Sequence, residues 1–319
     1  MEPTEAYDRL RQGAPVCACG GYLAGLDALH RSEICNALTF DRLNGKCRTV
    51  REVYLASGEN WNQTFYVMLF RYMGDPANRE TYMELARRVR YKTVLRERGE
   101  QGSVRIEAML FGGAGLLATL PEDDYTRLLQ REFDYLSRKY DIDPLESDRW
   151  QMRGIRPANR PTLRLAQLAA FLSRHEFVIE RVIECRSGAD VYRLFGVEAP
   201  QYWSSPCRTE DPASERPRRV GHFKSDILAI NLVAILQFAY GTYTAQDGLL
   251  ARAVALLESI PAEDNRYMRR WSDYGLRPAN AFESQAMLQL AAVYCASSRC
   301  TECPVGRRIV QELCGREER

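Results

Sequence analysis

Two stretches of sequence decide the fold. Residues 150–170 read WQMRGIRPANRPTLRLAQLAA, and residues 271–292 read WSDYGLRPANAFESQAMLQLAA. Both begin with tryptophan, reach a glycine, pass through Arg-Pro-Ala-Asn and close on Gln-Leu-Ala-Ala. Chance does not give so long a pattern twice, so the chain contains an internal duplication. Residues 74–86, GDPANRETYMELA, keep the glycine, Pro-Ala-Asn and Leu-Ala, and are interpreted as a worn third copy.

Apolar residues recur at helical spacing in most of the chain, for example in residues 61–73 and 123–140. Alternation with a period of two residues is almost absent, so strands are not expected. We predict an irregular N-terminal segment over residues 1–58, with turn signals at Asn44-Gly45, followed by a single all-α repeat domain over residues 59–319. This domain is expected to consist of stacked helical hairpins. Its copies are centred on residues 74–90, 150–175 and 271–295.

The repeated motif predicts helix caps and a pair of arginines. Asn78, Asn159 and Asn280 each precede an apolar-periodic segment, where the side chain can accept a hydrogen bond from a backbone N–H of the first helical turn. Arg156 and Arg277 occupy the same place in the two full copies. One interpretation is that two equivalent loops present paired guanidinium groups to a phosphate or carboxylate. The other is that each arginine binds carbonyls or a carboxylate inside its own repeat.

Two further segments are strongly basic. The first lies at the end of the helix expected over residues 79–90, and the second ends a long surface loop expected over residues 201–219. The first segment is either an anion-binding face or a solvated helix end that complements the helix dipole. The candidate anion-binding residues are Arg87, Arg88, Arg90, Lys92, Arg156, Arg277, Arg216, Arg218 and Arg219.

Three cysteines, Cys295, Cys300 and Cys303, lie within nine residues directly after the second Gln-Leu-Ala-Ala segment. Two cysteines separated by two residues can direct both thiolates to one tetrahedral metal, and the third supplies another ligand. Cys314 is the nearest fourth candidate, and Cys19 is the alternative. We predict a structural zinc ion or an iron–sulfur cluster at these residues, and the alternatives are buried thiols or a redox switch.

No catalytic motif stands out in the chain. None of the three histidines is spaced with carboxylates as in a zinc hydrolase or a catalytic triad. The glycine-rich run at residues 112–115 is not followed by the Gly-Lys-Ser/Thr of a phosphate loop, so close helix packing explains it better. The carboxylate pair Asp123-Asp124 starts a helix, where such residues commonly form caps. A non-catalytic protein is favoured, with an enzyme site around Arg156 and Arg277 as an alternative.

The composition is that of an ordinary globular protein. With 319 residues, of which 45% are hydrophobic and 27% charged, the chain can bury a full-sized core. A formal charge of +2 neither requires nor excludes an anionic partner. The first residues are acidic where a signal peptide is basic, and the apolar run over residues 227–240 is too short to span a bilayer. We expect a cytoplasmic protein with no membrane span.

Several short motifs occur together in this chain: WNQTFY at 61–66, IEAMLFGGAG at 106–115, RPANRPTLRLAQLA at 156–169, FAYG at 238–241, NAFESQA at 280–286, and the closing tyrosine and three cysteines of 294–303. Together they resemble an uncharacterised bacterial family, domain of unknown function 2851. The resemblance covers roughly residues 60–310 and implies no established activity. Longer members have an N-terminal region similar to the core of PD-(D/E)xK nucleases. The resemblance implies that this chain corresponds to the C-terminal helical part, without that nuclease-like region.

These observations favour a non-catalytic helical protein that binds nucleic acid, or an enzyme acting on nucleic acid, through its basic loops. A cysteine metal site near the C-terminus is expected to be structural. The main alternative is a scaffold that binds another protein through a concave repeat surface. The identity of the partner and the oligomeric state are left open by the sequence.

Overall fold

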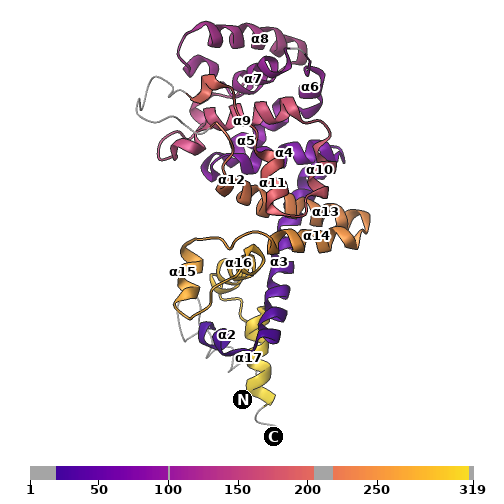
Figure 1. Cartoon of the computed structure of the whole chain (residues 1–319), viewed down its shortest axis with the longest axis vertical. Coiled ribbons are helices and arrows are strands. Elements are labelled where there is room, and N and C mark those ends of the chain that lie inside the picture. Colours follow the sequence, from indigo (N-terminus) through magenta and orange to yellow (C-terminus); the bar gives the residue numbers. More distant parts are fainter. Residues whose placement is uncertain (1–18, 100, 205–217, 316–319) are drawn as a thin grey trace. The chain divides into compact units, whose positions relative to one another are not determined.

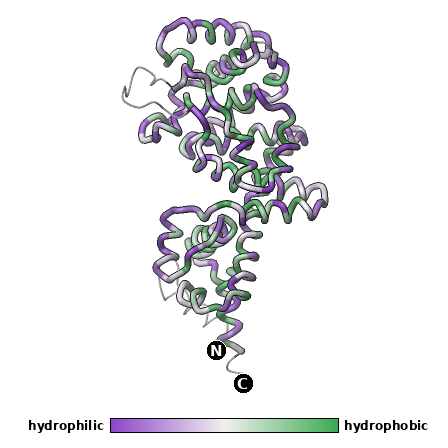
Figure 2. The backbone as a smooth tube through the Cα atoms, viewed as in Figure 1, coloured by the Kyte–Doolittle hydropathy of each residue, from purple (hydrophilic) through white to green (hydrophobic). Residues whose placement is uncertain are grey.

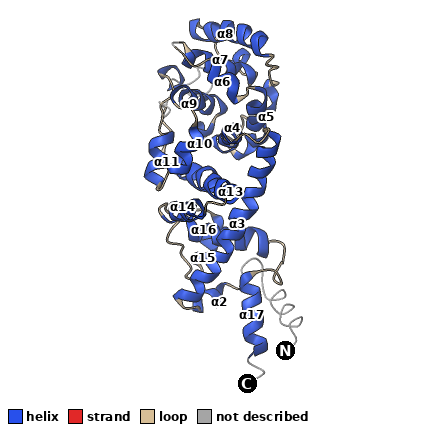
Figure 3. Ribbon diagram, turned by 90° about the vertical axis from the view of Figure 1, so that its right-hand side faces the viewer, coloured by secondary structure: helices blue, strands red, loops and turns tan. Residues whose placement is uncertain are grey.

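The structure, a computed structural model, describes residues 19–99, 101–204 and 218–315. Within these ranges the chain forms helices joined by loops, apart from isolated bridges between Glu198 and Arg219 and between Pro261 and Asn280 (Figures 1 and 3). The predicted all-α class is confirmed. Internal contacts divide the chain into two compact units. The central unit is residues 49–249, and the terminal unit is residues 1–48 together with 250–319.

Helix α3 (Ala28–Ala56) occupies most of the segment that was expected to be irregular, so that expectation was wrong for these residues. Its buried side chains include Ile34, Leu38 and Leu43, which follow helical spacing. Asn44 and Gly45 do not form the predicted turn but lie inside α3, because one glycine inside a long helix costs only about 1 kcal/mol. The boundary between the two units falls within α3, after residue 48, and therefore differs from the predicted boundary at residue 58.

The central unit is built from α3 beyond residue 48 and a series of shorter helices. In chain order these are α4 (Trp61–Met73), η1 (Pro76–Asn78), α5 (Arg79–Arg88), α6 (Tyr91–Arg96), α7 (Gly102–Gly113), η2 (Leu117–Thr119), α8 (Asp124–Tyr140), η3 (Ser147–Arg149), η4 (Pro157–Asn159), α9 (Pro161–Arg174), α10 (Val178–Glu184), α11 (Gly188–Phe195), η5 (Gln201–Ser204), α12 (His222–Leu228), η6 (Ala229–Val233) and α13 (Ala234–Thr244). Helix α4 packs against α5, and α7 packs against both α8 and α9.

The amphipathic character of α8 shows how these helices pack. It is coloured mainly as a hydrophilic helix in Figure 2, whereas Leu129, Phe133 and Leu136 on one face are buried. Gly112 of α7 lies directly against the ring of Phe133, and a side chain at residue 112 would collide with that ring. The close packing predicted for the glycine-rich run is therefore confirmed at this position.

One helical run, His222–Thr244, joins α12, η6 and α13 and is long and apolar enough to cross a membrane by length and composition. It is longer than the helix expected over residues 227–240. Most of its apolar window, 67%, is buried inside the protein, as in the core helix of a globular fold. Gln237 in this run donates to the carbonyls of Val182 (3.0 Å) and Cys185 (2.7 Å), which ties it to α10.

The terminal unit contains both described ends of the chain. Its elements are α2 (Gly20–Gly25), α3 up to residue 48, most of α14 (Asp247–Glu258), α15 (Arg266–Ser272), α16 (Ala281–Gln289), η7 (Leu290–Cys295) and α17 (Pro304–Gly315). Leu38, Trp271, Leu290 and Val305 share its apolar core, so segments from the two ends of the sequence form one cluster.

Candidate functional site

The worn copy of the motif, residues 74–86, packs against the full copy at residues 150–170 within the central unit. Asn78 donates through Nδ2 to the carbonyl of Gln151 (2.9 Å) and accepts at Oδ1 from the N–H of the same residue (2.7 Å). The ring of Tyr82 meets that of Trp150 edge to face, with 4.9 Å between centroids. Paired hydrogen bonds and aromatic packing therefore fasten the two copies to each other.

The three motif asparagines, all within the described ranges, do not share one role. Asn280 caps α16, since its Oδ1 accepts from a backbone N–H of the first turn at 3.1 Å, and the predicted cap is confirmed there. The prediction was wrong for Asn78 and Asn159, whose side chains make no cap. Asn159 instead accepts from Nη2 of Arg164 (2.8 Å) and donates to Oδ2 of Asp75 (3.4 Å).

Two buried cations lie where these copies meet. Arg164 is 5% exposed and Lys224 is 6% exposed. Arg164 donates through Nη1 to Oε1 of Gln167 (2.7 Å), and Lys224 donates to the carbonyls of Tyr72 (3.3 Å) and Gly74 (3.1 Å). Neither cation forms an ion pair with a residue that the structure describes. Neutral oxygens therefore hold both positive charges.

This environment disfavours the charged forms. Burial, together with the charge of Arg164, lowers the pKa of Lys224 to about 7, while Asp75 acts in the opposite direction. Burial likewise lowers the pKa of Arg164 to about 10. The ring of Tyr82 lies directly against Gly74, so the cluster is tightly packed at this point. We interpret it as a joint between the motif copies rather than as a ligand site.

The central unit also contains a hollow of about 970 Å³, which we call the basic hollow. Its walls come from the second half of α3, one side of α4, α5, the corner between α5 and α6, α6 itself, and Phe177. That corner is held firmly. The hydroxyl of Tyr66 donates to the carbonyl of Val89 (2.7 Å), and Oε1 of Gln63 accepts from the N–H of Tyr91 (3.0 Å). Side chains that project from the corner therefore start from a fixed backbone.

Bases outnumber acids in the lining of the basic hollow. The titratable side chains there, other than Tyr91, are Arg71, Arg87, Arg90, Lys92, Glu52 and Glu80. Nη1 of Arg71 lies 3.2 Å from Oε1 of Glu80, so these two charges compensate each other. Arg87 is half exposed and lies 3.6 Å from a carboxylate oxygen of Glu84. Arg90 and Lys92 are exposed and form no ion pair with any described residue, so their charges face solvent.

Three other predicted anion-binding arginines, Arg88, Arg156 and Arg277, do not line the basic hollow. Arg88 is engaged within the fold, because its guanidinium contacts carboxylate oxygens of Glu84 (3.1 Å) and Asp143 (2.9 Å). Arg156 is exposed in the central unit. Arg277 belongs to the terminal unit, where it lines a separate pocket of about 360 Å³. The structure therefore does not place the two motif arginines within one unit.

The basic cluster at residues 216–219 is only partly described. Arg216 lies outside the described residues. Nη2 of Arg218 lies 3.4 Å from a carboxylate oxygen of Glu198, and the guanidinium of Arg219 lies 4.9 Å from the centroid of the Tyr192 ring. Both contacts are made inside the central unit, so these two guanidinium groups already interact with side chains of the protein.

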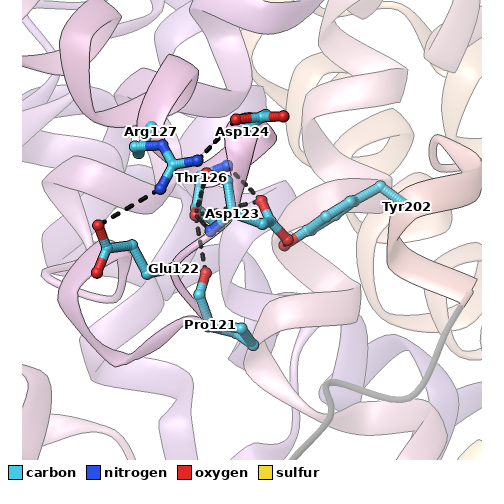
Figure 4. Close-up of polar contacts among 7 residues, drawn as sticks. All are labelled: Pro121, Glu122, Asp123, Asp124, Thr126, Arg127 and Tyr202. Atoms are coloured by element: carbon cyan, nitrogen blue, oxygen red, sulfur yellow. Dashed lines mark hydrogen bonds and ion pairs between the residues drawn. The ribbon is translucent and has the colours of Figure 1, made fainter.

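Segment η5, at the start of the expected surface loop, is docked on the fold. Nε1 of Trp203 donates to Oε2 of Glu107 (2.7 Å), which also accepts from the hydroxyl of Tyr125 (2.9 Å). Burial raises the pKa of Glu107 to about 7. The hydroxyl of Tyr202 donates to Oδ2 of Asp123 (2.9 Å), the residue that caps α8 as predicted (Figure 4). Here carboxylates anchor structure, and no basic residue approaches Glu107 among the described contacts.

Sequence reasoning missed Phe177. This residue lines the basic hollow, is 54% exposed and has a left-handed backbone conformation with φ 46° and ψ 51°. The signal available in the sequence was weak, because one aromatic residue in a helical protein ordinarily indicates core packing. Its significance appears only when its exposure and its basic neighbours are known.

The predicted cysteine centre is described in part. Cys303 is buried in the same apolar core as Cys19, and burial raises its pKa. Cys295 and Cys300 are partly buried. Among the described residues, no group of three or more His, Cys, Asp or Glu side chains is placed to hold a metal ion. The side chain of Cys314 lies outside the described residues, and the metal centre stays a prediction.

Comparison with known proteins identifies a family. A family model described as "Protein of unknown function (DUF2851)" matches residues 2–266. Neither a curated protein nor a solved structure matches the chain. The match covers the short motifs up to residue 241 and reaches into the N-terminal region, where no motif had been recognised, but it ends before the motifs at 280–286 and 294–303.

Proposed function

The chain belongs to the DUF2851 family, and we propose that its central unit binds nucleic acid through the basic hollow. The observation that carries the proposal is that the charges of Arg90 and Lys92 have no described carboxylate partner. Both are exposed in a concave surface, and neither is neutralised by a described carboxylate. Uncompensated cations in a hollow create a positive potential that attracts a polyanion.

The chemistry of these groups favours phosphate as the recognised anion. A guanidinium presents a planar set of donors that matches phosphate oxygens, and a lysine ammonium adds a compact charge. Arg90 projects from the corner that Tyr66 and Gln63 hold in place, so little backbone ordering is needed when it binds. Arg87 supplies a third cation at the wall formed by α5. Three neighbouring cations suit successive phosphates of a nucleic-acid strand.

The test is the salt dependence of binding to a fluorescently labelled oligonucleotide, measured by anisotropy. Wild type is expected to lose affinity steeply as salt rises. In the double variant Arg90→Ala/Lys92→Ala, the slope of log affinity against log salt should decrease by about two units, because two phosphate contacts are lost. Equal slopes in the variant and wild type would contradict the proposal.

A matched control separates a specific contact from a change in net charge. Arg127 and Arg193 are exposed arginines of the central unit that do not line the basic hollow. The double variant Arg127→Ala/Arg193→Ala removes the same charge from other helices. It should keep the wild-type slope, whereas a slope that falls equally in both double variants would show only a general effect of charge.

A further inference from the structure

Neither the core nor the backbone accounts for the aromatic side chain at residue 177. More than half of the Phe177 side chain is exposed, so it contributes little to the core. Its φ of 46° is in the left-handed region, which glycine and asparagine adopt readily and a bulky residue rarely does. The following residues, Val178 and Ile179, are buried and fix the start of α10. A glycine at residue 177 would serve this turn better.

The hollow that Phe177 lines has more basic than acidic side chains. Arg90 and Lys92 line the same hollow. In the segment around Phe177, the exposed bases Arg174 and Arg181 are balanced by the exposed acids Glu176 and Glu180, so the positive charge near the ring comes from the hollow. An exposed ring beside such cations is the arrangement by which proteins hold single strands. The cations follow the phosphates, and an unpaired base stacks on the ring.

We infer that Phe177 is a stacking platform and that the basic hollow takes single-stranded nucleic acid in preference to duplex. The inference rests on the proposed nucleic-acid function and names the form of its ligand. In a duplex the bases are stacked on one another and their faces are not available to a protein ring. A strand can offer an unstacked base to Phe177 while its phosphates meet Arg90 and Lys92. Backbone strain of this kind is tolerated where the side chain serves binding.

The experiment measures anisotropy with a labelled oligothymidylate strand and with a DNA duplex of the same length. Phe177→Gly removes the ring and suits the left-handed backbone, so the fold should be kept. It is expected to weaken binding of the strand about tenfold and to leave duplex binding unchanged. Phe177→Leu keeps an apolar side chain without a π-face and should behave like the glycine variant. Phe177→Tyr restores a ring and should bind the strand as wild type does.

The outcomes separate this inference from the function it rests on. If Phe177→Gly binds the strand as tightly as wild type while Arg90→Ala/Lys92→Ala does not, the nucleic-acid function stands and the stacking role is refuted. If Phe177→Leu retains full affinity, simple apolar contact replaces stacking and the inference also fails. If wild type binds neither strand nor duplex, both proposals fall. Equal loss of strand and duplex binding in Phe177→Gly would overturn the preference for single strands.

Discussion

The buried lysine of the motif joint makes a prediction about stability and pH. Lys224 is nearly inaccessible and is held by two carbonyls, and its pKa falls from 10.5 to about 7 on folding. Between these two pH values the unfolded chain holds the proton and the folded chain releases it. The unfolded state then binds more protons, so stability rises as pH increases from about 7 towards 10.5. Below about pH 7 both states are protonated, and the full cost of burying the charge is present.

The magnitude follows from the width of that window. Each pH unit between the folded and unfolded pKa values changes the free energy of unfolding by about 1.4 kcal/mol. From pH 7 to pH 9, Lys224 should therefore stabilise the fold by about 2 kcal/mol. Other groups also make stability depend on pH near 9, including the thiols of Cys47 and Cys185, whose pKa burial raises from 9.0 in the unfolded chain to about 12 in the folded one. A difference between wild type and a variant cancels their contributions.

The assay is urea unfolding of wild type and Lys224→Met at pH 7, 8 and 9. Wild type should gain about 2 kcal/mol more than the variant over this range. The absolute stability of the variant is less informative, because methionine also leaves the carbonyls of Tyr72 and Gly74 without their donor. Lys92→Met, at an exposed lysine, should follow the wild-type profile. Parallel profiles for wild type and Lys224→Met would refute the reasoning.

Three other measurements address separate parts of the protein. Burial raises the pKa of Glu107 to about 7, so between pH 5 and pH 7 only the unfolded chain loses this proton and the stability of wild type should fall as pH rises. In thermal unfolding, Glu107→Gln should lack this fall of stability with pH. The same fall in the variant would show that Glu107 is not its cause. Asn280→Ala should cost about 1 kcal/mol through loss of a cap. Asn159→Ala should cost about 1–3 kcal/mol because it leaves Nη2 of buried Arg164 without its acceptor, and equal costs of the two variants in urea unfolding would contradict the distinction. Metal analysis of protein purified without oxygen should find zinc or iron that Cys300→Ala loses, and protein that never contains metal would leave the cysteines as buried thiols.

The sequence predicts the helical class well, because apolar spacing is a local property of each helix. It fails where a long-range contact decides the role of a residue. Asn78 precedes a helix and has the residue type of a cap, yet its partner is the backbone of Gln151 in another copy of the motif. The sequence also identified Arg88 and Arg90 as one basic cluster, and only the fold separates them. Arg88 turns toward Asp143, while Arg90 lines the basic hollow.

The worn copy lacks the arginine of the motif, and the buried cluster around Lys224 gives a physical explanation. Where the full copies have an aliphatic residue and an arginine, the worn copy has only Asp75. An arginine at that place would bring another positive charge toward Lys224, whose charged form Arg164 already disfavours. The carboxylate of Asp75 instead raises the pKa of Lys224 and accepts from the amide of Asn159. The arginine can be kept at residues 156 and 277 because both side chains are exposed there, whereas residue 75 lies near the buried cation Lys224, which a negative neighbour stabilises.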